Sequence, residues 1–164
     1  YFDVFAGAFG HTYGCHDIWQ MFALNRTPVN GPHFPWYVAL DLPGASQMKY
    51  LRNLIESRPM FDRVPDQTLI TNALHSNDHI QATRGKDYIF VYSAQGRKFT
   101  VLTSKISGKE IQATWYNPKN GELKDIGKFT KNAQQEFTPP TSGYGHDWAL
   151  IIDDVSKNYV APGK

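Results

Sequence analysis

The sequence has little of three features that would narrow its function. Cys15 is the single cysteine among 164 residues, so no disulfide can form within the chain and a buried thiol is expected. No run of about 20 apolar residues is present, so no membrane-spanning helix is predicted. The formal net charge is only +2 and no basic run is dense, which argues against nucleic-acid binding.

The beginning of the sequence also lacks several expected signals. It has no initiator methionine, no helix cap and no signal-peptide pattern, and residues 1–8 are typical of the apolar end of a helix. We therefore expect a fragment, a processed product or one half of a nicked enzyme. Any export signal would then lie upstream of Tyr1.

The first third of the chain predicts mixed structure. With 41% hydrophobic and 14% aromatic residues, the chain can bury one or two small cores. Apolar residues recur at helical spacing over residues 44–57, and Pro59 fits a stop just beyond this helix. Residues 1 to about 58 thus predict a helix, a short strand, a long loop and a second helix. The loop over residues 25–43 is long enough to favour a functional or packing role.

After Pro59 the pattern changes to short strands. Turn signals rich in glycine, asparagine and proline separate most of the β-rich runs, a spacing that predicts an antiparallel β-sandwich. The runs cover residues 80–83, 88–92, 99–102, 111–116, 123–129, 136–138 and 148–152. Residues 61–66 are predicted to be the joint between the two parts.

Residues 9–22 have the composition of a ligand pocket. They contain two histidines, a tyrosine, a tryptophan and an aspartate beside two glycines. Aromatic faces, ring nitrogens and a carboxylate offer stacking and hydrogen bonds to a polyhydroxylated molecule, and glycine allows close approach of the chain. A sugar-binding site is the first hypothesis.

Each polar candidate in this segment has a second interpretation. Asp17 is the one local carboxylate and could act as acid or base, although an aspartate in such a place more often caps a helix or orients a neighbour. His11 and His16 can bind sugar hydroxyls, hold a catalytic carboxylate from elsewhere, or simply be satisfied within the packing. Together with Cys15 these residues are competent metal ligands, but their spacing matches no structural zinc pattern. No metal and no cofactor are expected.

The aromatic candidates also have two interpretations each. Tyr13 and Trp19 can supply a stacking platform for a sugar or pack in the core, and the platform is favoured for Trp19. Trp36 and Tyr37 lie in the proline-rich loop, where they can line the rim of a cleft or pin the loop to its neighbours.

Several motifs together resemble a known family. They are VFAGAFGHTYG at 4–14, HDIWQ at 16–20, WYVALD at 36–41, PGA at 43–45, SRP at 57–59, YNP at 116–118, Gly121, FTPP at 137–140 and DW at 147–148. With them, nearly the whole chain resembles the C-terminal part of a bacterial glycoside hydrolase family that includes the apiosidases. In that family a (β/α)8 barrel is followed by a β-sandwich described as a collagen-binding domain.

The resemblance implies a fold and a function. It implies an α+β fragment, with the last βα unit of a TIM barrel at residues 1–62 and a β-sandwich at residues 63–164. It places the catalytic acid and nucleophile upstream of Tyr1, so this chain alone should be inert. The implied substrate is an oligosaccharide or polysaccharide of plant cell walls, of pectic type. The implied location of the parent enzyme is the periplasm or the cell exterior.

Three functional hypotheses remain at this point. The chain is the C-terminal part of a glycosidase, or a non-catalytic carbohydrate-binding module, or a structural module that binds a protein such as collagen. The second requires exposed coplanar aromatic residues on the sandwich, for which Trp115, Tyr116 and Trp148 are the candidates, although a core position is favoured for Trp148. A lone βα unit leaves open edges and an uncovered apolar face, so the upstream barrel polypeptide is an expected partner.

Overall fold

The first part of the chain is helical. The computed structural model describes residues 1–72 and 74–164. Its helices are α1 (Phe2–Phe5), α2 (His16–Trp19), α3 (Trp36–Ala39) and α4 (Pro43–Glu56). Proline is favoured at the start of a helix because its missing N–H needs no partner there, and α4 begins with Pro43. The helix predicted for residues 44–57 is confirmed within one residue at each end.

The rest of the chain is built from antiparallel strands. They are β1 (Val64–Pro65), β2 (Ile80–Arg84), β3 (Tyr88–Ser93), β4 (Phe99–Val101), β5 (Glu110–Tyr116), β6 (Leu123–Thr130), β7 (Gln135–Phe137) and β8 (Trp148–Asp154). Short 3-10 helices lie between or after them at Met60–Asp62, Gln67–Leu69, Ser76–Asp78, Thr103–Lys105 and Val155–Lys157. Seven of these strands coincide with the seven predicted runs, and β1 lies in the segment predicted as a joint.

The strands form two sheets that enclose a core. Six strands pair in the order β1-β2-β3-β8-β5-β6, and β4 pairs with β7 in a second sheet. Alternate side chains of the large sheet, among them Trp115 and Trp148, pack against Phe99 and Phe137 of the small one. All four are buried, so the predicted antiparallel sandwich is confirmed.

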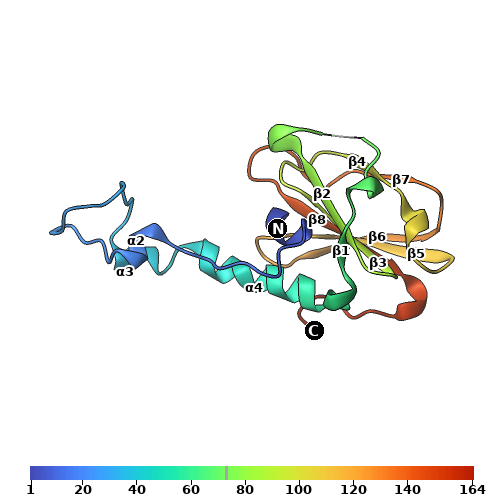
Figure 1. The fold of residues 1–164 in the computed structure, drawn as a ribbon, viewed down its shortest axis with the longest axis horizontal. Helices are drawn as coiled ribbons and strands as arrows, with labels where there is room; N and C mark the ends of the chain where they lie inside the picture. The colour runs from blue at the N-terminus through green and yellow to red at the C-terminus, as the bar shows by residue number, and fades with distance from the viewer. Residues whose placement is uncertain (73) are drawn as a thin grey trace.

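The opposite face of the six-stranded sheet is covered by α1 and α4 (Figure 1). Leu54 of α4 and Phe5 of α1 are fully buried there against Phe90 and Tyr116 of the sheet. The sheet is therefore apolar on both sides, and the two predicted parts of the chain share a core.

Residues 15–42, which we call the arm, lie away from the sheets. In Figure 1 α4 runs from the sandwich to the arm, and α2, α3 and the loop between them extend beyond its N-terminal end. The short strand expected within residues 1–58 is not formed, although the structure describes all of these residues. A strand needs neighbours for its N–H and C=O groups, and among the described residues no strand lies alongside that segment.

Within the described residues, no helix combines the length and the apolar character needed to cross a lipid bilayer.

Candidate functional site

The arm contains a hydrogen-bonded pair formed by His16 and Trp19. His16 begins α2 and Trp19 lies three residues later, so both side chains lie on one face of the helix. The indole Nε1 of Trp19 donates to Nδ1 of His16 over 2.7 Å, with the ring centroids 5.1 Å apart. On its other side His16 places Nε2 2.7 Å from the carbonyl oxygen of Val29.

These contacts set the role of Nδ1 in the His16 ring. An indole N–H can only donate, so Nδ1 of His16 accepts from Trp19. Nε2 of His16 lies 2.7 Å from the Val29 carbonyl oxygen and 2.8 Å from Nε2 of Gln20. Gln20 completes the network, because its Oε1 accepts from the Val29 N–H and its Nε2 donates to the Val29 carbonyl, each over 3.0 Å. Both nitrogens of His16 are thus engaged, and α2 is tied to the loop at Val29.

Asp17 lies inside the arm. Its side chain is buried, and Oδ1 accepts from the backbone N–H of His33 at 2.8 Å and of Phe34 at 3.4 Å. The nearest thiol, Cys15 Sγ, is 4.0 Å from the other carboxylate oxygen. The carboxylate therefore holds the return of the loop against α2, in the orienting role that was the second interpretation of Asp17.

The two tryptophans of the arm lie on adjoining helices. Trp36 is the first residue of α3, which packs beside α2, and its backbone N–H donates to Phe22 over 2.8 Å. The Trp36 ring lies edge-on to Tyr37, with centroids 5.8 Å apart. Trp19 is 66% exposed, so a large aromatic surface of the arm faces solvent while its polar edge is held by His16.

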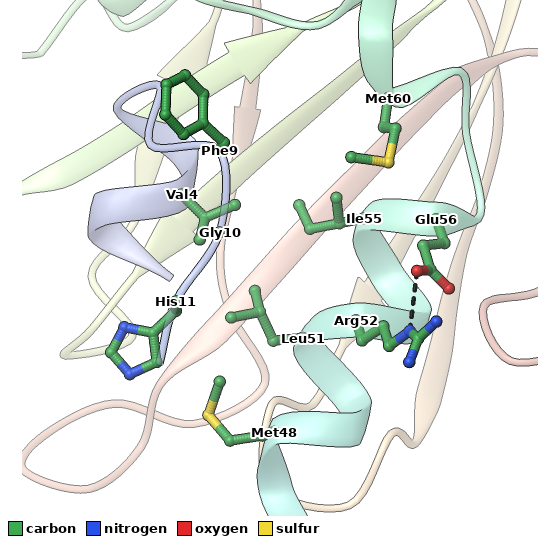
Figure 2. A pocket seen from close by; sticks show the side chains of 10 residues that line it. All are labelled: Val4, Phe9, Gly10, His11, Met48, Leu51, Arg52, Ile55, Glu56 and Met60. Carbon is green, nitrogen blue, oxygen red and sulfur yellow. Dashed lines mark hydrogen bonds and ion pairs between the residues drawn. The ribbon is translucent and has the colours of Figure 1, made fainter. Parts of the chain in front are cut away.

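Tyr13 and His11 lie apart from this group, against α4. The Tyr13 ring sits over Gly44, so closely that a Cβ on Gly44 would be 2.6 Å from the Tyr13 hydroxyl. His11 borders a groove of about 320 Å³ between the N-terminal segment and α4 (Figure 2). Figure 2 shows Leu51 and Ile55 of α4 turned toward this segment.

The groove in Figure 2 is mainly apolar. Its other lining residues are Val4, Phe9, Gly10, Met48, Arg52, Glu56 and Met60. Arg52 and Glu56 form an exposed ion pair at 2.8 Å and so satisfy one another. A groove of this kind offers few polar groups to a sugar and suits apolar side chains of a polypeptide better.

A second groove of about 320 Å³ lies where α1 and α4 meet the sandwich. His11 and Tyr13 line it together with Asp3, Lys119 and Asp147, so charged side chains of both signs border this groove. The hydroxyl of Tyr92 donates to Asp147 over 3.1 Å, and burial beside that carboxylate raises the pKa of Tyr92 far above its usual range. The sequence did not indicate that Lys119 and Asp147 would approach the N-terminal segment.

The structure thus divides the six sequence-predicted site residues into two groups. His16, Asp17, Trp19 and Trp36 come together in the arm, while His11 and Tyr13 lie in the grooves along α4. Gln20 was missed, although its position four residues after His16 on a helix is a usable signal. Across residues 1–72 and 74–164, no three histidine, cysteine or acidic side chains are placed to hold a metal ion.

The aromatic residues proposed for a sandwich surface are all buried. Trp115 and Trp148 lie in the core between the sheets, where a core position was favoured for Trp148. Tyr116 points to the other face but is covered by α4, to which its hydroxyl donates at the Tyr50 carbonyl over 2.9 Å. Among the described residues of the sandwich, Tyr144 is the one well-exposed aromatic side chain. The coplanar surface that a carbohydrate-binding module requires is therefore not formed by these residues.

Two family models match this chain. Residues 64–153 match the family model described as "Putative collagen-binding domain of a collagenase". The chain belongs to this family. Residues 1–62 match a second model, described as "Apiosidase-like, catalytic domain". The two matches together confirm the resemblance to apiosidase-like glycoside hydrolases that carry a C-terminal sandwich.

Solved structures show the same similarity. A protein described as a glycoside hydrolase is 45% identical, with a TM-score of 0.91 over 96% of this chain and 36% of its own. A glycoside hydrolase family 5 protein from Bacteroides vulgatus is 40% identical, with a TM-score of 0.91 over 98% of this chain and 36% of its own. The chain thus spans about a third of the length of these structures. No curated protein sequence matches it.

Proposed function

We propose that this chain is the C-terminal portion of a glycoside hydrolase that acts on a plant cell-wall glycan of pectic type. The observation that carries the proposal is the similarity, over almost the whole chain, to a longer protein described as a glycoside hydrolase. In this proposal residues 1–62 complete a (β/α)8 catalytic barrel and residues 63–164 form an accessory sandwich. The parent enzyme would act in the periplasm or outside the cell.

Exposed apolar side chains support the proposal that another part of the parent protein packs against this chain. Phe9 is fully exposed beside the apolar groove, and Leu24 and Leu40 are largely exposed in the arm. Apolar surface of this extent, on a segment that makes few contacts with the sandwich, is typical of a face that packs on another part of the protein. The upstream barrel of the same protein is the proposed occupant.

The chemistry of hydrolysis assigns the catalytic groups elsewhere. Glycosidases use two carboxyl groups about 5 to 10 Å apart, placed at the C-terminal ends of barrel strands. In this proposal Asp17 supplies neither carboxyl group, because its Oδ1 already accepts from two backbone N–H groups of the loop. The pair would come from upstream strands, and the arm would form one wall of the sugar pocket. Trp19 would provide the stacking surface and Trp36 would border it.

The test is the substitution Trp19→Ala in the full-length protein. We expect kcat/KM for sugar release from solubilised pectin to fall by roughly five- to 150-fold, since stacking of a flat ring on an aromatic side chain contributes about 1–3 kcal/mol where nucleobases are bound. The unfolding midpoint should change little, because Trp19 is mostly exposed. Tyr144→Ala, which removes an exposed aromatic of the sandwich, is the matched control and should leave both quantities unchanged.

The outcomes separate the possibilities. Unchanged kinetics in a well-folded Trp19→Ala protein would remove Trp19 from the site. Loss of glycan binding in Tyr144→Ala, with no effect of Trp19→Ala, would favour a non-catalytic binding module. No sugar release by the wild-type protein would contradict the pectic substrate.

A further inference from the structure

The network around His16 has a feature that a packing role alone does not require. Trp19 is a large, mostly exposed side chain, yet its single polar atom is held by a hydrogen bond of 2.7 Å. An exposed indole can satisfy its N–H with water, so satisfaction of that group does not need a protein partner. What the bond does is restrict the orientation of the ring.

His16 is itself held at its other nitrogen. Nε2 lies 2.7 Å from the Val29 carbonyl oxygen and 2.8 Å from Nε2 of Gln20, and Gln20 bonds both the N–H and the C=O of Val29. The imidazole therefore cannot rotate without losing a second bond. A chain of hydrogen bonds runs from the loop at Val29, through His16, to the edge of the Trp19 ring, and each member orients the next.

We propose that His16 is a positioning residue, which fixes the plane of the Trp19 indole so that one ring face is presented to a sugar. The neutral imidazole acts as hydrogen-bond acceptor for the indole and makes no contact with substrate itself. This inference rests on the proposed function, because it assigns Trp19 the stacking role. It replaces the direct hydrogen bond from His16 to sugar hydroxyls, since both nitrogens of the ring are already engaged.

The expected effect lies in substrate binding. A platform held in its bound orientation avoids the entropy of ordering a free side chain when the sugar arrives. Losing one such hydrogen bond should therefore raise KM by roughly three- to tenfold. The turnover number should change little, because stacking on a fixed ring serves ground state and transition state alike.

Two substitutions in the full-length protein test the proposal. His16→Phe keeps a planar ring and removes both hydrogen bonds, whereas His16→Gln retains an acceptor and a donor on one side chain. His33→Phe is the matched control, because the His33 ring lies in the same arm and only its backbone N–H is used in the contacts described. The substrate is solubilised pectin, and reducing-sugar release gives KM and kcat.

A second readout does not depend on activity. In protein labelled with ¹⁵N-tryptophan, the indole N–H resonance of Trp19 is assigned by its loss in Trp19→Phe. We expect His16→Phe to shift this resonance toward the position of a solvent-bonded indole and to raise KM. We expect His16→Gln to return both toward wild type and His33→Phe to alter neither.

Two results would overturn the proposal. The first is an unchanged Trp19 resonance and KM in His16→Phe. The second is an equal fall of kcat in both His16 variants with KM unchanged, which would make His16 a catalytic residue. If the wild-type protein releases no sugar from pectin, the proposed function fails. The positioning contact is then judged by the Trp19 resonance alone: a shift in His16→Phe that is reversed in His16→Gln shows that the contact exists independently of pectin hydrolysis.

Discussion

Arg58 donates two parallel hydrogen bonds to Asp153, from Nε to Oδ1 over 2.8 Å and from Nη2 to Oδ2 over 2.6 Å. Arg58 follows α4 in the segment that matches the catalytic-domain model, and Asp153 belongs to β8 of the sandwich. The guanidinium also lies 4.5 Å from the centre of the Tyr159 ring and donates to the carbonyls of Ser57 and Val160. A single buried side chain thus joins the end of α4, a central strand and the C-terminal tail.

Removing Arg58 should therefore weaken the whole unit. Arg58→Met leaves the largely buried Asp153 carboxylate without its partner, and we expect a loss of about 3–5 kcal/mol in the free energy of unfolding, measured with urea. Arg52→Ala breaks the exposed pair with Glu56 and should cost at most about 0.5 kcal/mol. Similar losses in the two variants would contradict a special role for the buried pair. The double variant Arg58→Met, Asp153→Leu should regain much of the stability.

Asp66 should make the fold sensitive to acid. Burial alone would raise the pKa of Asp66, but hydrogen bonds from Thr68, Arg84 and Lys105 outweigh it and lower the pKa well below its usual range. Because the folded value lies below the unfolded one, this carboxylate contributes stability above about pH 4 and the contribution is lost as the pH falls further. Asp66→Asn should be destabilised at pH 6 and approach wild type toward pH 3, as measured by urea unfolding at each pH. A constant difference across that range would contradict the assignment.

Tyr116 should make the contact between α4 and the sheet sensitive to alkali. Its hydroxyl donates to Tyr50 over 2.9 Å, and burial raises its pKa to about 12. The folded value exceeds the unfolded value of about 10, so the stability is complete below pH 10 and declines as the pH rises through 12. Tyr116→Phe should lose about 1 kcal/mol at pH 7 and show a weaker alkaline decline in thermal unfolding. The exposed Tyr144→Phe should behave as wild type at both pH values.

Gly96 should be intolerant of any side chain. It has φ of +56°, and a Cβ there would lie 2.1 Å from the Thr141 carbonyl oxygen and 2.7 Å from that of His146. These are backbone atoms, so the loop before β8 would have to move. We expect Gly96→Ala to cost roughly 2–4 kcal/mol from the left-handed conformation and the overlap together. Gly10→Ala, where no atom lies within 4 Å, should change the melting temperature little.

Local pattern was sufficient for the elements of the sandwich and for α4. Short β-rich apolar runs at β3 and β8, with turn residues between the runs, predicted strands whose bounds agree with the structure. Helical spacing and Pro59 predicted α4. The short strand expected within residues 1–58 is not formed in this structure, because a strand requires a partner along its edge and the pattern cannot supply one.

The sequence predicted which residues belong to the candidate site but not how they are arranged in space. The sequence indicated His11, Tyr13, His16, Asp17, Trp19 and Trp36, but periodicity could not tell that the first two face α4 and the others lie in the arm. Nor could it indicate that Asp17 would bind the backbone at His33, since that contact spans 16 residues. The family membership came from the joint occurrence of motifs, which is a property of the sequence.

The sequence by itself determined the strands, the long helix and the family, because each depends on residues near one another in the chain. Tertiary structure alone decided that α4 covers the second face of the sheet, which buries Tyr116 and removes it from any sugar surface. It also decided the partners of the His16 ring, because Nδ1 accepts from Trp19 while Nε2 lies against Val29 in the loop. These outcomes depend on contacts between distant segments, whose geometry is set only when the chain has packed.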